Sequence, residues 1–212
     1  MSTGVVALPE APCGPYDALY GAIPNRILWR TGECGWLRRL SPRALRVLDA
    51  GCGDGANAHF LETQGCAVTG VDVSGLALEG LRNRFEGCET PARGEYFQAD
   101  ILDFDQLRDH ELLVSCGLFH CLGPARRVDW HRRLNGAVRT GGLVLFTSLT
   151  SDIPLPDDHG TPSFTLPSRA EIRDLFELWD ILHSEVSTIS DQHAGLSPRH
   201  EHSIVRVVAK RR

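Results

Sequence analysis

Three glycines at alternate positions, Gly51, Gly53 and Gly55, follow a short apolar stretch and an aspartate, Asp49. Glycine accepts backbone torsions that other residues avoid, and it leaves no Cβ between the chain and a ligand. A helical stretch begins at residue 56, so the free N–H groups of a helix N-terminus should face this loop. The succession of strand, glycine loop and helix predicts half of a nucleotide-type cofactor site in a doubly wound α/β fold.

Two acidic residues indicate which cofactor the loop would hold. The dinucleotide fingerprint is G-x-G-x-x-G, whereas this loop reads G-x-G-x-G and is preceded by Asp49. A carboxylate there would repel a pyrophosphate but would suit a cationic group such as the ammonium of an amino acid. Asp72 ends the apolar stretch 67–73, 21 residues after Gly51, and an acid in that place accepts hydrogen bonds from ribose hydroxyls. The predicted ligand is a nucleoside with an amino-acid tail and no phosphates, which describes S-adenosylmethionine.

With these residues in place, the sequence resembles the class I S-adenosylmethionine-dependent methyltransferases over roughly residues 40–212. Three further segments stand in the order of that family: 95–100, 112–122 and 139–146. The resemblance implies that Asp100 lies near the adenine amino group and that residues 112–122 line the methyl-transfer site. The other cofactor contacts expected beside these motifs are Cys52, Val73, Ile101 and Cys116.

The acceptor side of the reaction would begin at His120, which follows the fourth predicted strand at the carboxyl edge of the sheet. Methyl transfer from a sulfonium is an in-line displacement, so the protein must mainly hold the nucleophile against the methyl group without water. An acceptor that is protonated at neutral pH would also need a base. His120 is therefore a candidate base or orienting donor, or alternatively a packed loop histidine, and Phe119 and Leu122 would form an apolar wall.

A second polar cluster, residues 191–202, stands between the last two predicted strands. His200 and His202 would share one face of an extended chain. Such a pair can bind a metal, but a third ligand would have to come from His193 or another loop, and methyl transfer needs no metal. We therefore predict no metal site. Instead we expect Arg199 and the histidines, with Arg199 and His200 as catalytic candidates, to offer cationic donors to an anionic acceptor. A solvated hairpin is the alternative.

Within the superfamily, the sequence is most similar to the small tellurite-resistance (TehB-like) and thiopurine methyltransferases. The resemblance depends on the short chain, a tyrosine-bearing N-terminal segment, and the stretches 179–182 and 204–210. It implies that a histidine and an arginine near His193 and Arg199 act on a chalcogen oxyanion. The candidate substrate contacts are Tyr16, Tyr20, Arg30, Phe119 and His193.

The nature of the acceptor stays open between a chalcogen or thiol compound and an oxygen or nitrogen atom of a small metabolite. The second possibility describes a natural-product O- or N-methyltransferase. Two alternatives come from other classes: a nicotinamide-dependent reductase, which the acid before the glycines disfavours, and a non-catalytic S-adenosylmethionine-binding module, which the polar acceptor side disfavours.

Composition limits the class of protein further. The 212 residues are 42% hydrophobic and carry a formal net charge of −5, which is ordinary for a globular domain and unlike a nucleic-acid-binding face. Short basic runs such as Arg126-Arg127 are attributed to solvated helix faces. The seven cysteines are irregularly spaced and include no C-x-x-C pair, so they predict neither disulfides nor a zinc site. We also find no apolar stretch long enough to span a membrane and no leader sequence. Together these features indicate a reducing cytoplasm. We expect a small-molecule substrate, no nucleic-acid or membrane partner, and leave the oligomeric state open.

The elements that must position these residues alternate between strand and helix and predict one domain, residues 1–212. Its expected fold is a Rossmann-like doubly wound sheet of seven strands with the last strand antiparallel. The expected strands are 47–50, 68–73, 96–99, 112–116, 143–147, 181–188 and 204–209. The expected helices are 56–64, 74–85, 125–138 and a fourth that runs from residue 168 to about 178 and begins with a capping box.

Two segments flank this core. Residues 1–40 are predicted to form an N-terminal helical cover over the cofactor, in which Leu37 and its neighbours share a helix face. Gly32 and Gly35 are expected to break the helices of this cover. The proline-rich residues 150–167 have the length of a possible lid loop.

Overall fold

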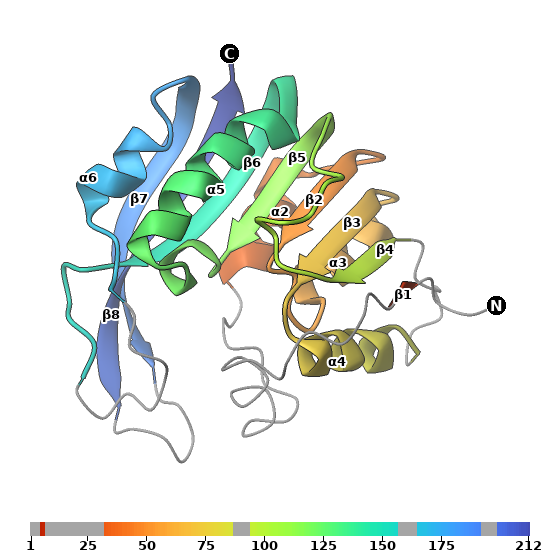
Figure 1. Cartoon of the computed structure of the whole chain (residues 1–212), viewed down its shortest axis with the longest axis horizontal. Coiled ribbons are helices and arrows are strands. Elements are labelled where there is room, and N and C mark those ends of the chain that lie inside the picture. The colour runs from red at the N-terminus through yellow and green to blue at the C-terminus, as the bar shows by residue number, and fades with distance from the viewer. Residues whose placement is uncertain (1–4, 7–31, 87–93, 157–164, 192–198) are drawn as a thin grey trace.

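The computed structural model describes residues 5–6, 32–86, 94–156, 165–191 and 199–212. Eight strands form one sheet in the order β1-β4-β3-β2-β5-β6-β8-β7 (Figure 1). Their bounds are β1 Val5–Val6, β2 Arg46–Ala50, β3 Ala67–Asp72, β4 Glu95–Gln98, β5 His110–Cys116, β6 Val138–Thr150, β7 Trp179–Asp191 and β8 His200–Arg211.

All seven predicted strands are present, and the sheet has the predicted directions. Neighbouring strands from β1 to β6 pair in parallel. Strand β8 lies between β6 and β7 and is antiparallel to both. The prediction of a doubly wound sheet with an antiparallel last strand is confirmed, and β1 extends the sheet by one short edge strand.

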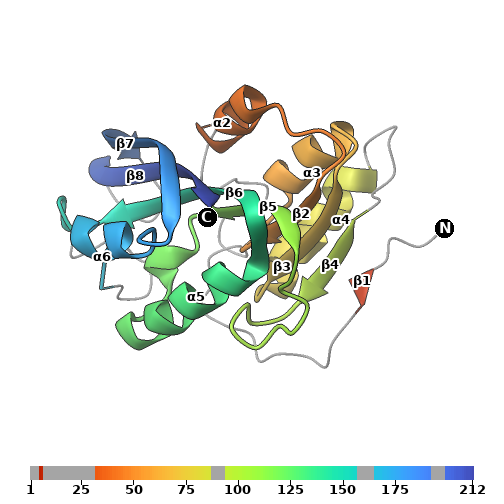
Figure 2. The same cartoon turned by 90° about the horizontal axis from the view of Figure 1, so that it is seen from above.

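Helices cover both faces of the sheet (Figure 2). Helices α2 and α3 lie on one face, and α5 and α6 lie on the other. Among the described residues, no helix is both long and apolar enough to span a membrane. The bounds are α2 Gly32–Leu40, α3 Ala56–Thr63, α4 Gly75–Glu86, the 3-10 turn η1 Phe119–Cys121, α5 Pro124–Ala137 and α6 Arg169–Asp174.

The two faces of the sheet give two apolar cores. Successive residues of a strand point to opposite faces, so in β2 Val47 packs with α2, α3 and α4 while Leu48 packs with α5 and α6. Both side chains are fully buried. The first core also contains Leu37, and the second contains Trp130 of α5. Burial of the central strands on both sides explains why their sequences read as continuous apolar runs.

The helix starts follow the capping residues in the sequence. The Ser74 hydroxyl accepts a hydrogen bond from the Ala77 amide at 3.1 Å, and the Ser168 hydroxyl accepts one from the Glu171 amide at 3.1 Å. These are the N-cap contacts expected of serine. Helix α6 ends at Asp174, earlier than predicted, and turns lead from it into β7.

The N-terminal segment differs in part from its prediction. The described residues form β1 and helix α2, and α2 runs without a break through Gly35. The prediction that Gly35 interrupts this helix is therefore wrong. A glycine inside a helix costs about 1 kcal/mol relative to alanine, and the complete burial of Leu37 offsets that cost. The Trp36 ring also packs against His183 of β7, with ring centroids 4.3 Å apart.

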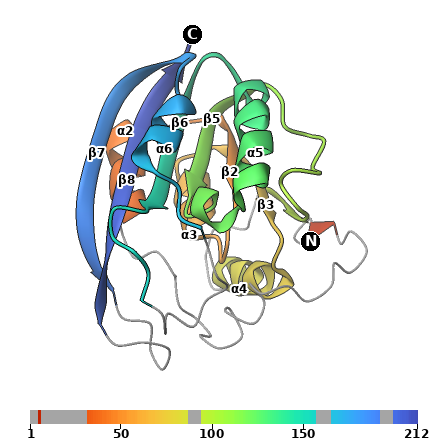
Figure 3. The ribbon, with the colours of Figure 1, turned by 60° about the vertical axis from the view of Figure 1, so that its left-hand side comes forward.

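One edge of the sheet collects the ends of many elements. The parallel strands β2, β3, β4, β5 and β6 all run toward the lower edge in Figure 1, and β8 starts from it because it runs in the opposite direction. Strands β7 and β8 project beyond the other strands there (Figure 3). Ligands of open α/β sheets bind outside the carboxyl ends of the strands, so this edge is where a site is expected.

Candidate functional site

The glycine loop leaves β2 at the centre of this edge and enters α3 directly. Gly51 and Gly55 have φ angles of +71° and +78°, which residues with a Cβ adopt only under strain. A Cβ on Gly55 would also stand 2.7 Å from the Leu81 side chain of α4. The Gly51 amide donates to the Val71 carbonyl at 2.8 Å, which holds the loop against β3. The loop is therefore a fixed cradle in which only glycine fits at these two positions.

Asp49 lies under this loop and is almost completely buried, with 1% of its surface exposed. Its Oδ2 atom has no hydrogen-bond partner among the described residues. Burial, with the nearby carboxylates of Asp72 and Asp54, raises the pKa of Asp49 to about 7. A buried carboxyl without a compensating cation is unfavourable in its charged form. An ammonium group of a ligand would supply that cation, so the residues present fit the amino-acid tail of S-adenosylmethionine.

Asp72 at the end of β3 connects two segments of the site. Its Oδ2 accepts from the Gly53 amide at 2.8 Å, and its Oδ1 accepts from the Ser74 amide at 2.9 Å. An ionised carboxylate can accept about four hydrogen bonds. Asp72 thus holds the glycine loop, and its contact with a ribose stays a prediction; the next residue, Val73, is exposed.

Asp100 follows β4 and makes a contact that the sequence did not predict. Its Oδ1 accepts from the Leu102 amide at 2.9 Å, and its Oδ2 forms an ion pair with Arg126 of α5. The intervening residue Ile101 is buried. An adenine amino group would have to share the Asp100 carboxylate with Arg126, and the adenine contact stays a prediction.

The loop after β5 carries His120 in the turn η1. His120 is 2% exposed, and its Nδ1 accepts a hydrogen bond from the Leu149 amide of β6 at 3.3 Å. A backbone N–H always donates, so Nδ1 is unprotonated and the neutral ring carries its proton on Nε2. In this arrangement Nε2 is a donor. The geometry therefore favours the orienting role of His120 over that of a general base.

The predicted neighbours of His120 are arranged differently. Phe119 is fully buried and packs edge-on against Phe146 at 5.5 Å between ring centroids, so it supports the loop from within the core. Cys116 ends β5 and is half-buried, with its Sγ 3.7 Å from the Thr147 hydroxyl. Cys52 in the glycine loop is buried, and burial raises the pKa of its thiol.

His200 and His202 lie side by side at the start of β8. Their Nε2 atoms are 2.9 Å apart, and the rings stand edge to face. One Nε2 must donate to the other, so the pair holds at least one proton between its two facing atoms. Arg199 is exposed, and its guanidinium donates to the Ser190 hydroxyl at 3.3 Å.

Several predicted site residues lie outside the described part of the chain: Tyr16, Tyr20, Arg30 and His193. In the part that the structure describes, no three His, Cys, Asp or Glu side chains are grouped so that they could hold a metal ion. The structure brings Asp49 and Asp72 together at the glycine loop, and it brings His200 and His202 together at the far end of the same edge.

Sequence reasoning missed the environment of the Arg126-Arg127 pair. The attribution of this pair to a solvated helix face is wrong for Arg127, which is 3% exposed and forms an ion pair with Glu171 of α6 at 2.6 Å. Arg126 pairs with Asp100. The only signal in the sequence is the capping box that includes Glu171, and that motif accounts for the Glu171 amide and not for its side chain.

Comparisons with known proteins agree with this geometry. Residues 47–142, which run from β2 into β6, match the family described as a methyltransferase domain. The chain is 30% identical over 135 residues to malonyl-[acyl-carrier protein] O-methyltransferase of Enterobacter lignolyticus, over 60% of this chain and 48% of that protein. It is 31% identical over 148 residues to a ubiquinone biosynthesis O-methyltransferase of Alkalilimnicola ehrlichii, over 62% and 58% of the two chains.

The solved structure of TehB from Haemophilus influenzae has the same fold, with a TM-score of 0.73 at 18% identity, over 92% of this chain and 67% of that one. The match to the methyltransferase-domain family is thus found over residues 47–142, and the structural likeness concerns the fold. The chain spans about half of the length of the first curated relative that it matches.

Proposed function

We propose that this protein transfers a methyl group from S-adenosylmethionine to a small-molecule acceptor. The buried Asp49 carboxyl carries the proposal, because its Oδ2 has no partner among the described residues and its position under the glycine loop suits an ammonium group. Asp72 would accept from the ribose hydroxyls while it holds the Gly53 amide. S-adenosylmethionine supplies an activated methyl group when it is bound, and the chain orients the two reactants and excludes water.

On the acceptor side, His120 would donate from Nε2 and so orient an acceptor atom with a lone pair. The backbone amide on its Nδ1 disfavours proton removal by this residue. An acceptor that is already anionic or strongly nucleophilic at neutral pH needs no base. A thiolate or a selenium or tellurium oxyanion has this property, and Arg199 would supply a cationic donor to it. We therefore favour a chalcogen or thiol acceptor.

An O- or N-methyltransferase acting on a natural product is the second candidate. It is supported by the two O-methyltransferase relatives at 30% and 31% identity, and the pair His200–His202 could receive a proton from such an acceptor. A phenol or amine would need that step because it is protonated at neutral pH. The two candidates therefore predict different pH profiles on thiols and on phenols.

The first experiment is calorimetric titration of the protein with S-adenosylmethionine, S-adenosylhomocysteine and NADH. We expect binding of the first two, whereas binding of NADH alone would refute the proposal in favour of a reductase. The second is a turnover assay with selenite, tellurite, small thiols, phenols and amines, in which methylated products are detected by mass spectrometry. Cofactor binding without turnover on any acceptor would favour a non-catalytic binding module.

The proposal extends to the cellular setting, the class of substrate and the domain organisation. We propose a reducing cytoplasmic setting, which the free thiols of Cys52 and Cys66 support. A nucleic-acid substrate is disfavoured by the formal net charge of −5. We further propose that residues 1–212 act as one domain and that the segment 150–167, described here only at its two ends, acts as a lid over the acceptor.

A further inference from the structure

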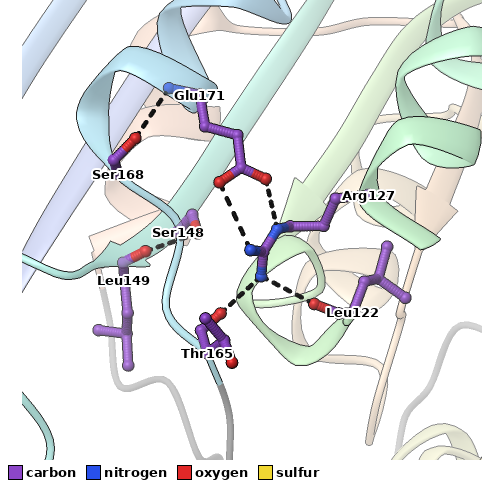
Figure 4. A network of polar contacts seen from close by, with 7 residues as sticks. All are labelled: Leu122, Arg127, Ser148, Leu149, Thr165, Ser168 and Glu171. Atoms are coloured by element: carbon purple, nitrogen blue, oxygen red, sulfur yellow. Dashed lines mark hydrogen bonds and ion pairs between the residues drawn. The ribbon is translucent and has the colours of Figure 1, made fainter. Parts of the chain in front are cut away.

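Arg127 of α5 is a buried cation whose contacts reach three other parts of the chain (Figure 4). Its Nε and Nη2 donate to the two carboxylate oxygens of Glu171 in α6, at 2.6 and 3.4 Å. Its Nη1 donates to the carbonyls of Leu122 at 2.9 Å and Thr165 at 2.6 Å. The guanidinium also lies over the Phe119 ring, 5.7 Å from its centroid. This side chain thus links α5 to three places: the turn η1 with the residue after it, the segment that leads into α6, and α6 itself.

The chemistry of this contact set requires arginine. Four hydrogen bonds leave one planar group in different directions, which the fork of a guanidinium allows and the single nitrogen of lysine does not. A buried cation is costly compared with an apolar residue of similar size. Leucine or methionine would therefore pack here at a lower cost in free energy. The presence of a charged arginine indicates that the geometry of its hydrogen bonds is needed.

The segments that Arg127 joins also contact each other through His120. The Leu149 amide of β6 donates to His120 Nδ1. Two residues further along, the Ser151 amide donates to the Pro167 carbonyl at 2.9 Å. The end of β6 thus contacts both the turn that carries His120 and the segment whose Thr165 carbonyl Arg127 holds. Displacing either of the two carbonyls bound by Nη1 would disturb the hydrogen bond that fixes the His120 tautomer.

We propose that Arg127 is a positioning residue for the acceptor side of the site. It holds the carbonyls of Leu122 and Thr165 at a fixed separation, and thereby it keeps the turn η1 and its His120 in place against the end of β6. Glu171 balances its charge and fixes its plane. That Arg127 holds these segments together follows from its contacts, whereas its effect on turnover rests on the proposed function.

The test compares four variants with the wild type. Arg127→Met removes the charge and keeps much of the volume, Arg127→Lys keeps the charge without the fork, and Glu171→Gln removes the balancing charge. Arg132→Met is the matched control, because Arg132 lies on the same helix and its side chain is 74% exposed. Backbone hydrogen exchange by mass spectrometry is measured on each full-length protein, together with calorimetric binding of S-adenosylhomocysteine and unfolding by urea.

We expect at least tenfold faster exchange in residues 118–123, 149–152 and 165–168 of Arg127→Met and Arg127→Lys. Residues 46–56 around the glycine loop should exchange as in the wild type, and the Kd for S-adenosylhomocysteine should change less than threefold. Glu171→Gln should give a smaller change in the same three segments, and Arg132→Met should give none. Unchanged exchange in Arg127→Met would overturn the inference. An increase spread evenly over the chain would do so too, because it would mean a general loss of stability.

The kinetic arm uses the acceptor on which the wild type turns over in the panel above. We expect at least a tenfold loss in kcat/KM for that acceptor in both Arg127 variants, with the KM for S-adenosylmethionine unchanged. An equal rise in the KM of both substrates would overturn the positioning role. If the wild type binds no S-adenosylhomocysteine, the proposed function fails, and the exchange pattern by itself then decides whether Arg127 holds the three segments.

Discussion

Replacing Asp49 with asparagine should make the free protein more stable and the cofactor complex weaker. In the folded chain, burial and the neighbouring carboxylates raise the pKa of Asp49 to about 7, whereas an aspartate in an unfolded chain has a pKa near 3.9. The folded state therefore binds a proton more readily than the unfolded state, so this residue lowers stability as pH rises from about 4 to about 7. Asparagine has the same shape and does not titrate.

The size of the effect follows from the displacement of the pKa. About three pK units correspond to about 4 kcal/mol of destabilisation at pH 8. The side-chain amide introduced by Asp49→Asn would leave an unsatisfied N–H, which costs about 1–3 kcal/mol, so the net gain is about 2 kcal/mol. For a chain of this length that is a rise in Tm of roughly 4–8 °C. At pH 5 the wild-type carboxyl is already protonated in the folded state, and the advantage of the variant should fall by about 3 kcal/mol.

The assay is urea unfolding of both proteins at pH 8 and pH 5, with Asp129→Asn on the exposed face of α5 as the control. Titration with S-adenosylmethionine should show a Kd about tenfold to a hundredfold higher for Asp49→Asn, because a charge-assisted contact is lost. Wild-type binding near pH 7 should also release protons, seen as a heat that depends on the ionisation enthalpy of the buffer. A stability difference that does not change with pH, or cofactor binding as tight as in the wild type, would refute the reasoning about Asp49.

Three further predictions concern single residues. Asp72→Ala should weaken S-adenosylmethionine binding by roughly 1.5–3 kcal/mol for each charge-assisted hydrogen bond lost, and an unchanged Kd by calorimetry would mean that the carboxylate does not contact the ribose. His120→Asn, which keeps an acceptor for the Leu149 amide, should lower kcat at least tenfold with little change in cofactor Kd, while equal losses in stability and cofactor binding would indicate a purely structural histidine. Burial lowers the pKa of His110, so the unfolded chain takes up a proton at a higher pH than the folded chain does, and stability should fall as pH drops below about 6.5. His110→Asn should flatten this dependence of stability on pH, measured by urea unfolding between pH 5 and 7. An unaltered dependence would mean that other groups cause it.

The sequence predicted those parts of the fold in which neighbouring residues by themselves favour the structure that the whole chain adopts. Val47 and Leu48 belong to an apolar run that is buried on both faces, and the glycine loop after them requires torsions that other residues resist. Ser74 and Ser168 mark helix starts through their own hydroxyls. Such features can be read from a few adjacent residues.

The parts that were missed depend on residues far apart in the chain. Gly35 stays helical because Leu37, two residues further along, is buried in the core. Helix propensities take no account of such packing. Strand β1 joins the sheet through pairing with β4 over only two residues, which leaves no alternation to detect. Arg127 and Glu171 are 44 residues apart, so the sequence shows two ordinary surface charges where the fold makes an ion pair with a buried guanidinium.

The position of β8 inside the sheet has a consequence for how the chain is made and folded. This strand is the last of the described elements, yet β6 and β7 pair on either side of it. During synthesis, the half of the sheet around β2 and β3 has its partners early, whereas β7 can join the sheet only after residues 200–211 have left the ribosome. We therefore expect chains stalled before residue 200 to resist proteolysis around the glycine loop while they remain open around β7, which pulse proteolysis of stalled ribosome complexes would measure.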